Sequence, residues 1–151
     1  MQNKHSPRVL VVDDSPEVLQ MIGNALGRLG FLTTPAPSGE LALKLVAQQP
    51  FDLILLDNQM PGLRGLEVCE RLKADPRYWS IPVIFITANA GHAFQAEAQR
   101  LGAVDVLGKP FGMEPLLRAV LTALKRPPAA GLTLAELFHA HAPPPPDGPP
   151  G

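Results

Sequence analysis

The sequence predicts an α/β fold built on a parallel five-stranded sheet with helices on both faces. Five short apolar runs, mostly rich in Val, Ile and Leu, recur within residues 1–126 of the 151-residue chain. Such runs suit parallel strands covered on both faces better than the alternating pattern of a half-exposed sheet. Amphipathic stretches separate the runs, and each strand–helix unit takes roughly 30 residues, as in right-handed βαβ crossovers.

The apolar runs give the expected strands and their order. In chain order the runs are Val9–Val12, Phe31–Thr34, Leu53–Leu56, Val83–Ile86 and Val104–Leu107. Pro35 and Pro37 follow the second run closely, and proline is tolerated mainly at the edge of a sheet. A second strand at the edge fits the order 2-1-3-4-5 of the flavodoxin-like, doubly wound (βα)5 fold.

Start and stop signals place the helices between these strands. Ser15 can cap the first helix, with Pro16 at its first position and Glu17 near its positive end. Gly30 ends this helix, and Ser38 is the expected cap of the second. The other three helices are expected at about 66–73, 93–101 and 114–125.

Composition and charge exclude several function classes. The formal net charge of −1 gives no reason to expect a nucleic-acid partner, and the sequence has no polybasic run to hold an anionic membrane. The single cysteine, Cys69, excludes an intramolecular disulfide. The polar start of the chain is followed by too short an apolar run for a signal peptide. We therefore expect a cytoplasmic protein with no DNA or membrane partner.

The composition changes after Arg126, where prolines become frequent. We expect residues 1–126 to form the domain and residues 127–151 to be a Pro-rich, mostly disordered tail. A tail of this length is too short for an output domain, so the output is expected to be contact with another protein.

One part of this tail has a helix signature. Thr133 and Glu136 match a capping box, and Leu132 and Leu137 match a hydrophobic staple. A helix at 134–141 is too short to be stable alone. Three possibilities stay open for this segment: it docks on its own domain, it docks on a partner, or it remains unfolded.

Chemically active side chains gather at the ends of the expected strands. The first strand runs into Asp13 and Asp14, the third into Asp57, the fourth into Thr87, and the fifth leads to Lys109. In an open parallel sheet, ligands bind beyond the carboxyl ends of the strands, where the strand order reverses. That point lies between the first and third strands, so the three carboxylates are expected to meet.

Three neighbouring carboxylates repel one another and raise one another's pKa values, and a hard divalent cation removes this conflict. Oxygen ligands with room for water suit Mg²⁺ best. Thr87 and Lys109 are donors and suit phosphoryl oxygens instead. Together these groups form a nucleophilic carboxylate, a metal and two donors for phosphoryl transfer.

The motifs that carry these residues resemble a response-regulator receiver domain. They are VLVVDD at 9–14, LILLDNQMPG at 53–62 with Gly65 beyond it, IFITA at 84–88, GAVD at 102–105 and KPF at 109–111. Each motif alone is weak, but the ordered set covers nearly all of residues 8–125 at the spacings of that family. The chain is therefore similar to receiver domains over its whole expected domain.

The resemblance implies a role for each residue of the acidic cluster. Asp57 resembles the aspartate that accepts a phosphoryl group. Asp13 and Asp14 resemble the acidic pair that holds Mg²⁺ together with Asp57 and the backbone carbonyl of Gln59.

The resemblance also assigns the residues opposite this cluster. Thr87, Ala88 and Lys109 resemble the groups that bind the phosphoryl oxygens, and Thr87 moves when the domain switches. The bond between Lys109 and Pro110 is cis in the family. Family members often carry an inward-turning aromatic residue three positions before the lysine, and here Val106 takes that position. The chain therefore departs from the family's rotating-aromatic switch at this position.

The implied function is that of a phosphoacceptor in two-component signalling. A sensor histidine kinase or histidine phosphotransfer protein is the expected donor. A downstream effector protein is the expected target, and the fourth helix, fifth strand and fifth helix are a candidate homodimer face. Such a domain is not an enzyme in the usual sense, since it promotes only its own phosphorylation and dephosphorylation.

Three different functions stay open beside this one. A phosphorelay intermediate or phosphate sink uses the same chemistry without a direct effector. An aspartate-nucleophile phosphatase of the haloacid-dehalogenase type requires a second Asp two positions after the first, but Gln59 follows Asp57 and Ser15 follows Asp13. An unphosphorylated binding module would have a degenerate site.

Several residues also have structural interpretations without a functional role. Asp13 and Asp14 could cap the first helix, Thr87 could be a turn residue and Lys109 a surface lysine. We expect Cys69 to be a buried structural thiol. We expect His92 to be exposed, and Tyr78 and Trp79 to cover a hydrophobic edge. His139 and His141 lack acidic or thiol partners nearby, so we expect no metal site there.

Overall fold

The protein is described by a computed structural model over residues 6–125, which form five strands and five helices in strict alternation. The elements are β1 (Arg8–Val12), α1 (Pro16–Arg28), β2 (Leu32–Ala36), α2 (Gly39–Gln48), β3 (Leu53–Asp57), α3 (Gly65–Lys73), β4 (Val83–Thr87), α4 (His92–Arg100), β5 (Asp105–Gly108) and α5 (Met113–Ala123). The expected tail, its short helix at 134–141 and both of its histidines lie outside the described residues.

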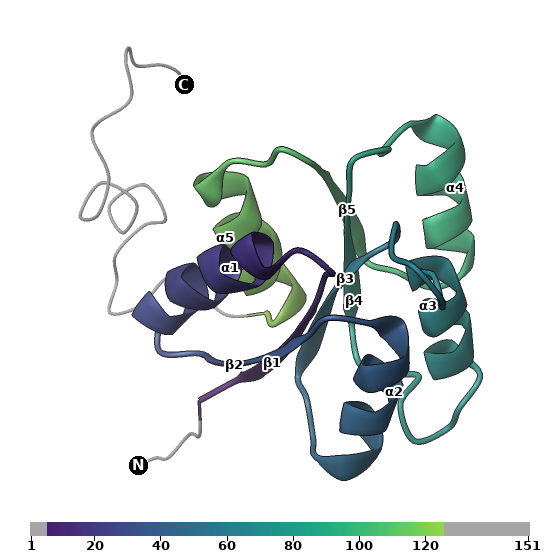
Figure 1. Ribbon diagram of the computed structural model, residues 1–151, viewed down its shortest axis with the longest axis horizontal. Coiled ribbons are helices and arrows are strands. Elements are labelled where there is room, and N and C mark those ends of the chain that lie inside the picture. The colour runs from purple at the N-terminus through teal and green to yellow at the C-terminus, as the bar shows by residue number, and fades with distance from the viewer. Residues whose placement is uncertain (1–5, 126–151) are drawn as a thin grey trace.

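The strands form one parallel sheet in the order β2-β1-β3-β4-β5, as the sequence predicts. Helices α1 and α5 cover one face of the sheet, and α2, α3 and α4 cover the other (Figure 1). The fold is therefore the flavodoxin-like, doubly wound one, with the reversal of strand order between β1 and β3.

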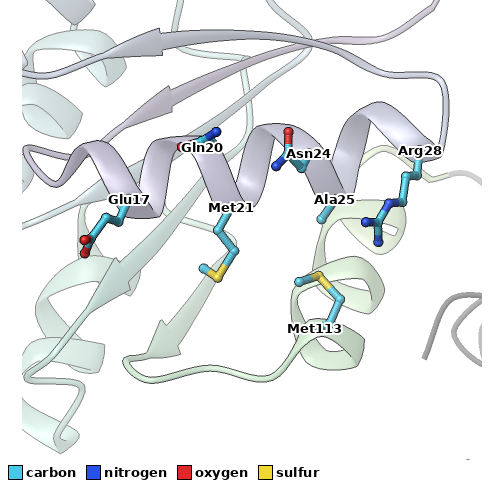
Figure 2. A pocket seen from close by; sticks show the side chains of 7 residues that line it. All are labelled: Glu17, Gln20, Met21, Asn24, Ala25, Arg28 and Met113. Carbon is cyan, nitrogen blue, oxygen red and sulfur yellow. The ribbon is translucent and has the colours of Figure 1, made fainter. Parts of the chain in front are cut away.

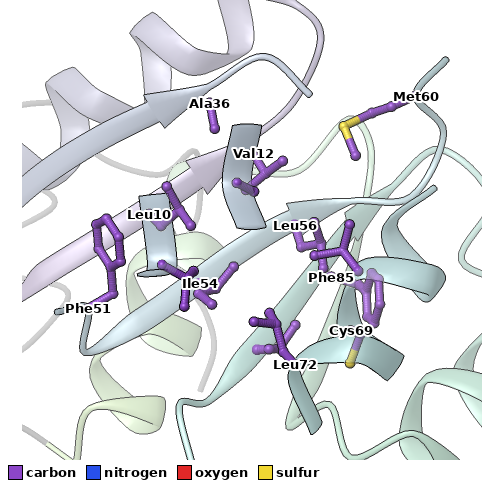
Figure 3. Packing of buried hydrophobic residues seen from close by; sticks show 14 of the residues in the cluster. Leu10, Val12, Ala36, Phe51, Ile54, Leu56, Met60, Cys69, Leu72 and Phe85 are labelled. Atoms are coloured by element: carbon purple, nitrogen blue, oxygen red, sulfur yellow. The ribbon is translucent and has the colours of Figure 1, made fainter. Parts of the chain in front are cut away.

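Alternate residues of the central strands supply the two sides of the core. One apolar cluster lies between the sheet and α2, α3 and α4 (Figure 3). Its largest fully buried side chain is Phe85, whose ring meets that of Phe94 edge-on at 5.2 Å. The second cluster lies under α1 and α5 and includes Ile22 and Leu116. The two clusters fix the sheet rigidly between its helices.

The helix starts follow the sequence signals. Ser15 caps α1 through a hydrogen bond that its hydroxyl accepts from the Val18 N–H, and Ser38 does the same for α2 with Leu41. Because Ser15 is the cap, the interpretation in which Asp13 or Asp14 caps the helix is wrong. Gly30 follows α1 with a φ of 87°, a conformation that glycine adopts without strain.

The two edge strands depart from the sequence prediction. Pro35 lies within β2, paired with Val11, rather than after the strand. An edge strand accepts it because the ladder does not need every N–H there. Strand β5 begins one residue later than expected, and Val104 before it is 56% exposed. Burial on both faces holds for β1, β3 and β4 but not for β2 and β5, each of which has a neighbouring strand on one side only.

Within residues 6–125, none of the helices combines the length and the apolar character needed to cross a bilayer.

Candidate functional site

The acidic residues meet at the carboxyl end of the sheet. Val12 pairs with Leu56, so Asp13 and Asp57 stand level at the ends of adjacent strands. Both are buried, with 0% and 3% of their surfaces exposed, whereas Asp14 is exposed. One carboxylate oxygen from each of the three aspartates lies within 4.8 Å of the others. The sequence prediction that these residues form one cluster is confirmed.

Lys109 closes the pocket from the opposite side. Its Nζ lies 2.8 Å from Oδ2 of Asp13 and 3.5 Å from Oδ1 of Asp57. The lysine side chain is 24% exposed, so the pocket is open to solvent on this side. A surface role for Lys109 is excluded by these contacts. The ammonium group lies nearer to Asp13 than to Asp57, which the sequence did not indicate.

Burial and charge shift the pKa values of these groups. Desolvation, followed by the charge of Asp13, raises the pKa of Asp57 despite the opposing effects of Lys109 and the Gln59 backbone N–H. Burial alone would lower the pKa of Lys109, but its hydrogen bond to Asp13 and the charges of both aspartates raise it overall. The lysine therefore keeps its proton at neutral pH.

The oxygen set fits a divalent cation. Oδ1 of Asp13 accepts a hydrogen bond from the Ser15 N–H at 2.9 Å. Oδ2 of Asp13 is buried, and Nζ of Lys109 lies 2.8 Å from it. The oxygens of Asp13, Asp14 and Asp57 that lie within 4.8 Å of one another are three carboxylate ligands for an ion. Hard oxygen ligands that are partly open to water match the preference of Mg²⁺.

Thr87 and Ala88 end the neighbouring strand. Thr87 is completely buried, and its carbonyl oxygen accepts a hydrogen bond from the Lys109 N–H at 2.7 Å. Its hydroxyl oxygen accepts from the Asn89 N–H at 3.1 Å, as in a turn, while Ala88 is exposed. The backbone contact joins the end of β4 to the loop that carries Lys109. Thr87 is thus tied to both its turn and this loop.

The peptide bond between Lys109 and Pro110 is cis, as the family resemblance implies.

The loop after Asp57 has anchors that the sequence did not reveal. Oδ1 of Asn58 accepts from the Leu66 N–H at 2.9 Å, which ties this loop to the start of α3. Oε2 of Glu40, in the first turn of α2, accepts from the Leu63 N–H at 3.1 Å. Gly65 packs so closely that a Cβ there would lie 2.4 Å from the Asp57 carbonyl oxygen. The motif contains Asn58 and Gly65, but no local signal points to Glu40.

The positions of Gln59 and Val106 leave their roles as predictions. The Gln59 side chain is exposed, and its backbone N–H acts on the Asp57 carboxylate. The metal-binding role of its carbonyl rests on the resemblance. Val106 is half-buried on β5 and packs against the cluster that contains Phe85. Phe94 of α4 supplies the aromatic ring that packs in this part of the core.

The remaining residues have mostly structural roles. Cys69 is fully buried, and burial raises the pKa of its thiol to about 11, so it is not a reactive group. His92 is exposed at the start of α4, as expected. Tyr78 packs on the core as predicted, but Trp79 is 59% exposed, so the expectation that both cover an edge is wrong for the tryptophan.

The fold and pocket together define a doubly wound domain with an acidic, lysine-bearing site at its switch point. Residues 9–121 match the family model of the response regulator receiver domain, and the chain belongs to this family.

Individual relatives agree with this assignment. A probable chemotaxis protein CheY of Rhizobium etli is 34% identical over 122 residues, covering 78% of this chain and 95% of that protein. A solved structure of the chemotaxis protein CheY4 of Vibrio cholerae has a TM-score of 0.75 at 30% identity, covering 78% of this chain and 98% of that one. The chain therefore resembles CheY proteins in sequence and in fold over most of their length.

Other relatives are longer. A probable cyclic di-GMP phosphodiesterase of Vibrio cholerae is 37% identical over 119 residues, which are 79% of this chain but 26% of that protein. The chain spans about half the length of several DNA-binding regulators that it matches, such as MtrA of Mycolicibacterium smegmatis. The activities of those whole proteins belong to them.

Proposed function

We propose that Asp57 accepts a phosphoryl group from a phosphohistidine on a sensor kinase or phosphotransfer protein, and that the phosphorylated domain signals by contact with another protein. An Asp57 carboxylate oxygen attacks phosphorus, the phosphorus–nitrogen bond breaks, and the imidazole leaves. The observation that carries this proposal is the position of Asp57, buried at the end of β3 beside Asp13 and 3.5 Å from the Lys109 ammonium.

The donor set supports Mg²⁺ as the cofactor. Asp13, Asp14 and Asp57 would hold the ion with side-chain oxygens, and the Gln59 carbonyl is a fourth candidate. When bound, Mg²⁺ neutralises negative charge on the pocket and on the incoming phosphoryl group. Lys109 adds an ammonium donor for charge that develops on the phosphoryl oxygens.

The contact between Thr87 and Lys109 suggests how phosphorylation changes the surface. The two residues end β4 and follow β5, and a backbone hydrogen bond of 2.7 Å links them. If the Thr87 hydroxyl leaves the Asn89 N–H for a phosphoryl oxygen, the β4–α4 loop must rearrange. Shifting the ratio of the two conformational states of the domain from 1:99 to 99:1 requires about 5.5 kcal/mol. Two charge-assisted contacts of about 1.5–3 kcal/mol each can approach this value.

The face formed by α4, β5 and α5 is then the proposed contact surface for an effector or a second copy. It includes Val106, at the position of the family's aromatic residue. Phe94 of α4 packs against the same core cluster as Val106.

Labelling with a small phosphodonor tests the phosphoacceptor role. The wild-type chain, incubated with acetyl phosphate and Mg²⁺, should gain one phosphoryl group by mass spectrometry. Asp57→Asn should gain none, whereas Asp75→Asn, which changes an aspartate on the loop after α3, should be labelled like the wild type. Undiminished labelling of Asp57→Asn would exclude this residue as the acceptor.

Magnesium binding separates this proposal from a degenerate binding module. At ten times the dissociation constant, Mg²⁺ should stabilise the wild-type domain by about 1.4 kcal/mol. This gain, measured by thermal unfolding with and without EDTA, should disappear in Asp13→Asn and persist in Asp75→Asn. An equal gain in all three proteins would place the ion elsewhere.

Two further measurements distinguish the phosphoacceptor from a relay protein and from a phosphatase. Onward transfer from phosphorylated Asp57 to a second histidine protein would identify a relay intermediate. Repeated turnover of a phosphomonoester would instead identify a phosphatase.

A further inference from the structure

The loop between β4 and α4 is held from the helix side by a glutamine. Nε2 of Gln95 donates a hydrogen bond of 2.7 Å to the Ala90 carbonyl oxygen, reaching back across the start of α4. Helices α1 and α2 begin with a serine whose hydroxyl caps the first turn, but the N-cap of α4 is Gly91, which has no side chain for this purpose. The Gln95 amide is therefore the side chain that ties the start of α4 to the preceding loop.

The loop that Gln95 holds belongs to the site. It begins at Thr87, whose hydroxyl oxygen accepts a hydrogen bond from the Asn89 N–H, and it continues through Ala90. A Cβ on Gly108 would lie 3.4 Å from the Ala90 Cβ, so Ala90 lies against the end of β5, immediately before the lysine of the pocket. A movement of Thr87 toward the acidic pocket would therefore pull on a segment that Gln95 holds at its other end.

We propose that Gln95 is a positioning residue that holds the β4–α4 loop in its unphosphorylated arrangement, and that phosphorylation releases its amide. This inference rests on the proposed function, in which the Thr87 hydroxyl leaves the Asn89 N–H for a phosphoryl oxygen. The bond from Gln95 fixes Ala90, the residue that follows Asn89, and so favours the arrangement in which Thr87 stays in its turn. A contact that exists in one of two states shifts the equilibrium toward that state.

The size of the effect follows from the exposure of this hydrogen bond. Gln95 lies at the surface, where water competes for both partners, so the net contribution of the bond corresponds to about two- to fivefold in an equilibrium. Loss of the bond should raise the population of the rearranged loop by this factor. Affinity for Mg²⁺ should stay the same, because the three carboxylates that would hold the ion follow β1 and end β3.

Release of the amide changes one particular surface. Gln95 and Gln99 line a hollow of about 170 Å³ between α4 and β5, together with Val106. A glutamine amide has two N–H donors, and the bond to Ala90 occupies one of them. After release, the amide is a free donor on the α4, β5 and α5 face, which is the contact surface proposed above.

A second groove gives the contrast. It has a volume of about 380 Å³ and lies between α1 and α5, where Gln20, Met21 and Met113 are among its lining residues (Figure 2). None of its lining residues belongs to the β4–α4 loop or to α4, and α1 and α5 cover the other face of the sheet (Figure 1). Phosphorylation should therefore change the hollow beside Gln95 more than this groove.

Water-exchange NMR of the full chain tests the resting bond without any phosphorylation. Gln95→Met keeps the length and the helix propensity of the side chain but removes the donor. The Asn89 N–H should then exchange with water about two- to fivefold faster than in the wild type, because its loop opens more often. Gln99→Met places the same side chain one turn further along α4 and should leave this rate unchanged. An unchanged Asn89 rate in Gln95→Met would overturn the proposal.

Labelling kinetics distinguish a positioning role from a structural one. With acetyl phosphate and saturating Mg²⁺, Gln95→Met should be labelled about two- to fivefold faster than the wild type, and Gln99→Met at the wild-type rate. The dissociation constant for Mg²⁺ should be equal in all three proteins. A side chain that only stabilised α4 would give an equal or slower rate when it is replaced, and either result would overturn the proposal. A changed dissociation constant would also overturn it, since Gln95 would then act on the metal site.

The side-chain amide signals of glutamine report the release itself. Beryllofluoride with Mg²⁺, a stable mimic of the phosphoryl group, should shift the Gln95 amide signals of the wild type. The amides of Gln20 on α1 and Gln48 on α2 are the references and should not shift. Asp57→Asn should show no shift at any of the three.

The outcomes separate this proposal from the proposed function. If beryllofluoride shifts the Thr87 signals but leaves those of Gln95 in place, release of the amide is overturned and the phosphoacceptor role stands. If neither acetyl phosphate nor beryllofluoride acts on the wild type, the proposed function is overturned. The Asn89 exchange rate would still show whether Gln95 holds the loop.

Discussion

The apolar core and the charged pocket are separated by one residue along each of two strands. Val12 and Leu56 are fully buried in the core, and the next residues, Asp13 and Asp57, are almost as deeply buried but carry charge. Burial stabilises the first pair through the hydrophobic effect and penalises the second pair through desolvation. The raised pKa of Asp57 reflects that penalty.

This difference indicates a division of roles within the sheet. The core provides a rigid frame of buried, mostly apolar side chains. The pocket uses that frame to hold like charges together, which is unfavourable until a cation or a phosphoryl group arrives. Substitutions in the core should therefore affect stability, while substitutions in the pocket should affect labelling more than stability.

The largest expected effect on stability belongs to the centre of the core. Phe85→Ala removes the largest fully buried side chain and its contact with Phe94, and should lower the free energy of unfolding by about 3–5 kcal/mol. Leu32→Ala, at a side chain that is 50% exposed on the edge strand, should cost far less. Urea denaturation measures both. Similar losses would contradict the distinction between central and edge strands.

The next largest loss of stability is expected for a substitution of Gly65, which supports the pocket. Gly65→Ala places a methyl group 2.4 Å from the Asp57 carbonyl oxygen, so the backbone around the acceptor must shift. We expect a loss of about 1–3 kcal/mol and slower labelling by acetyl phosphate. Gly27→Ala is the matched control, since its Cβ meets nothing within 4 Å in α1 and should stabilise by about 0.5–1 kcal/mol. Losses of equal size would show that helix geometry, and not the close approach, governs Gly65.

Removal of the buried charge of Asp57 should raise the free energy of unfolding, whereas Phe85→Ala and Gly65→Ala should lower it. Asp57→Asn should abolish labelling, yet it also removes a carboxylate that is desolvated and repelled by Asp13, while Lys109 keeps its contact with Asp13. In EDTA at neutral pH, we expect the free energy of unfolding to rise by about 1 kcal/mol. A decrease of several kcal/mol would mean that the Asp57–Lys109 pair stabilises the fold, and that the pocket is not strained.

The sequence predicted those features that depend on neighbours in the chain. The apolar runs located all five strands, and Ser15 and Ser38 located two helix starts, because strand burial and capping act within a few residues. The cluster of Asp13, Asp14 and Asp57 was also predictable, since parallel strands bring their carboxyl ends to one edge.

Contacts made only in three dimensions were not predictable. Glu40 reaches the loop after Asp57 from another helix, 23 residues before its partner Leu63, and nothing in the local sequence marks it. The inclusion of Pro35 in β2 and the exposure of Val104 depend on which strands lie at the edges and on how far each ladder continues. The nearer approach of Lys109 to Asp13 than to Asp57 depends on side-chain geometry within the pocket.

The smallest predicted effect tests whether this remote anchor belongs to the pocket. Glu40→Ala removes the acceptor for the Leu63 N–H and should cost about 0.5–1.5 kcal/mol, together with a modest decrease in labelling rate as the loop after Asp57 loosens. Glu114→Ala is the matched control, because Glu114 also lies in the first turn of its helix, α5, and pairs with Arg118 of the same helix. If the two variants label at the same rate and unfold at the same urea concentration, Glu40 acts only through its helix. A slower rate in Glu40→Ala alone would extend the pocket's supporting structure to α2, across the strand-order reversal from Lys109.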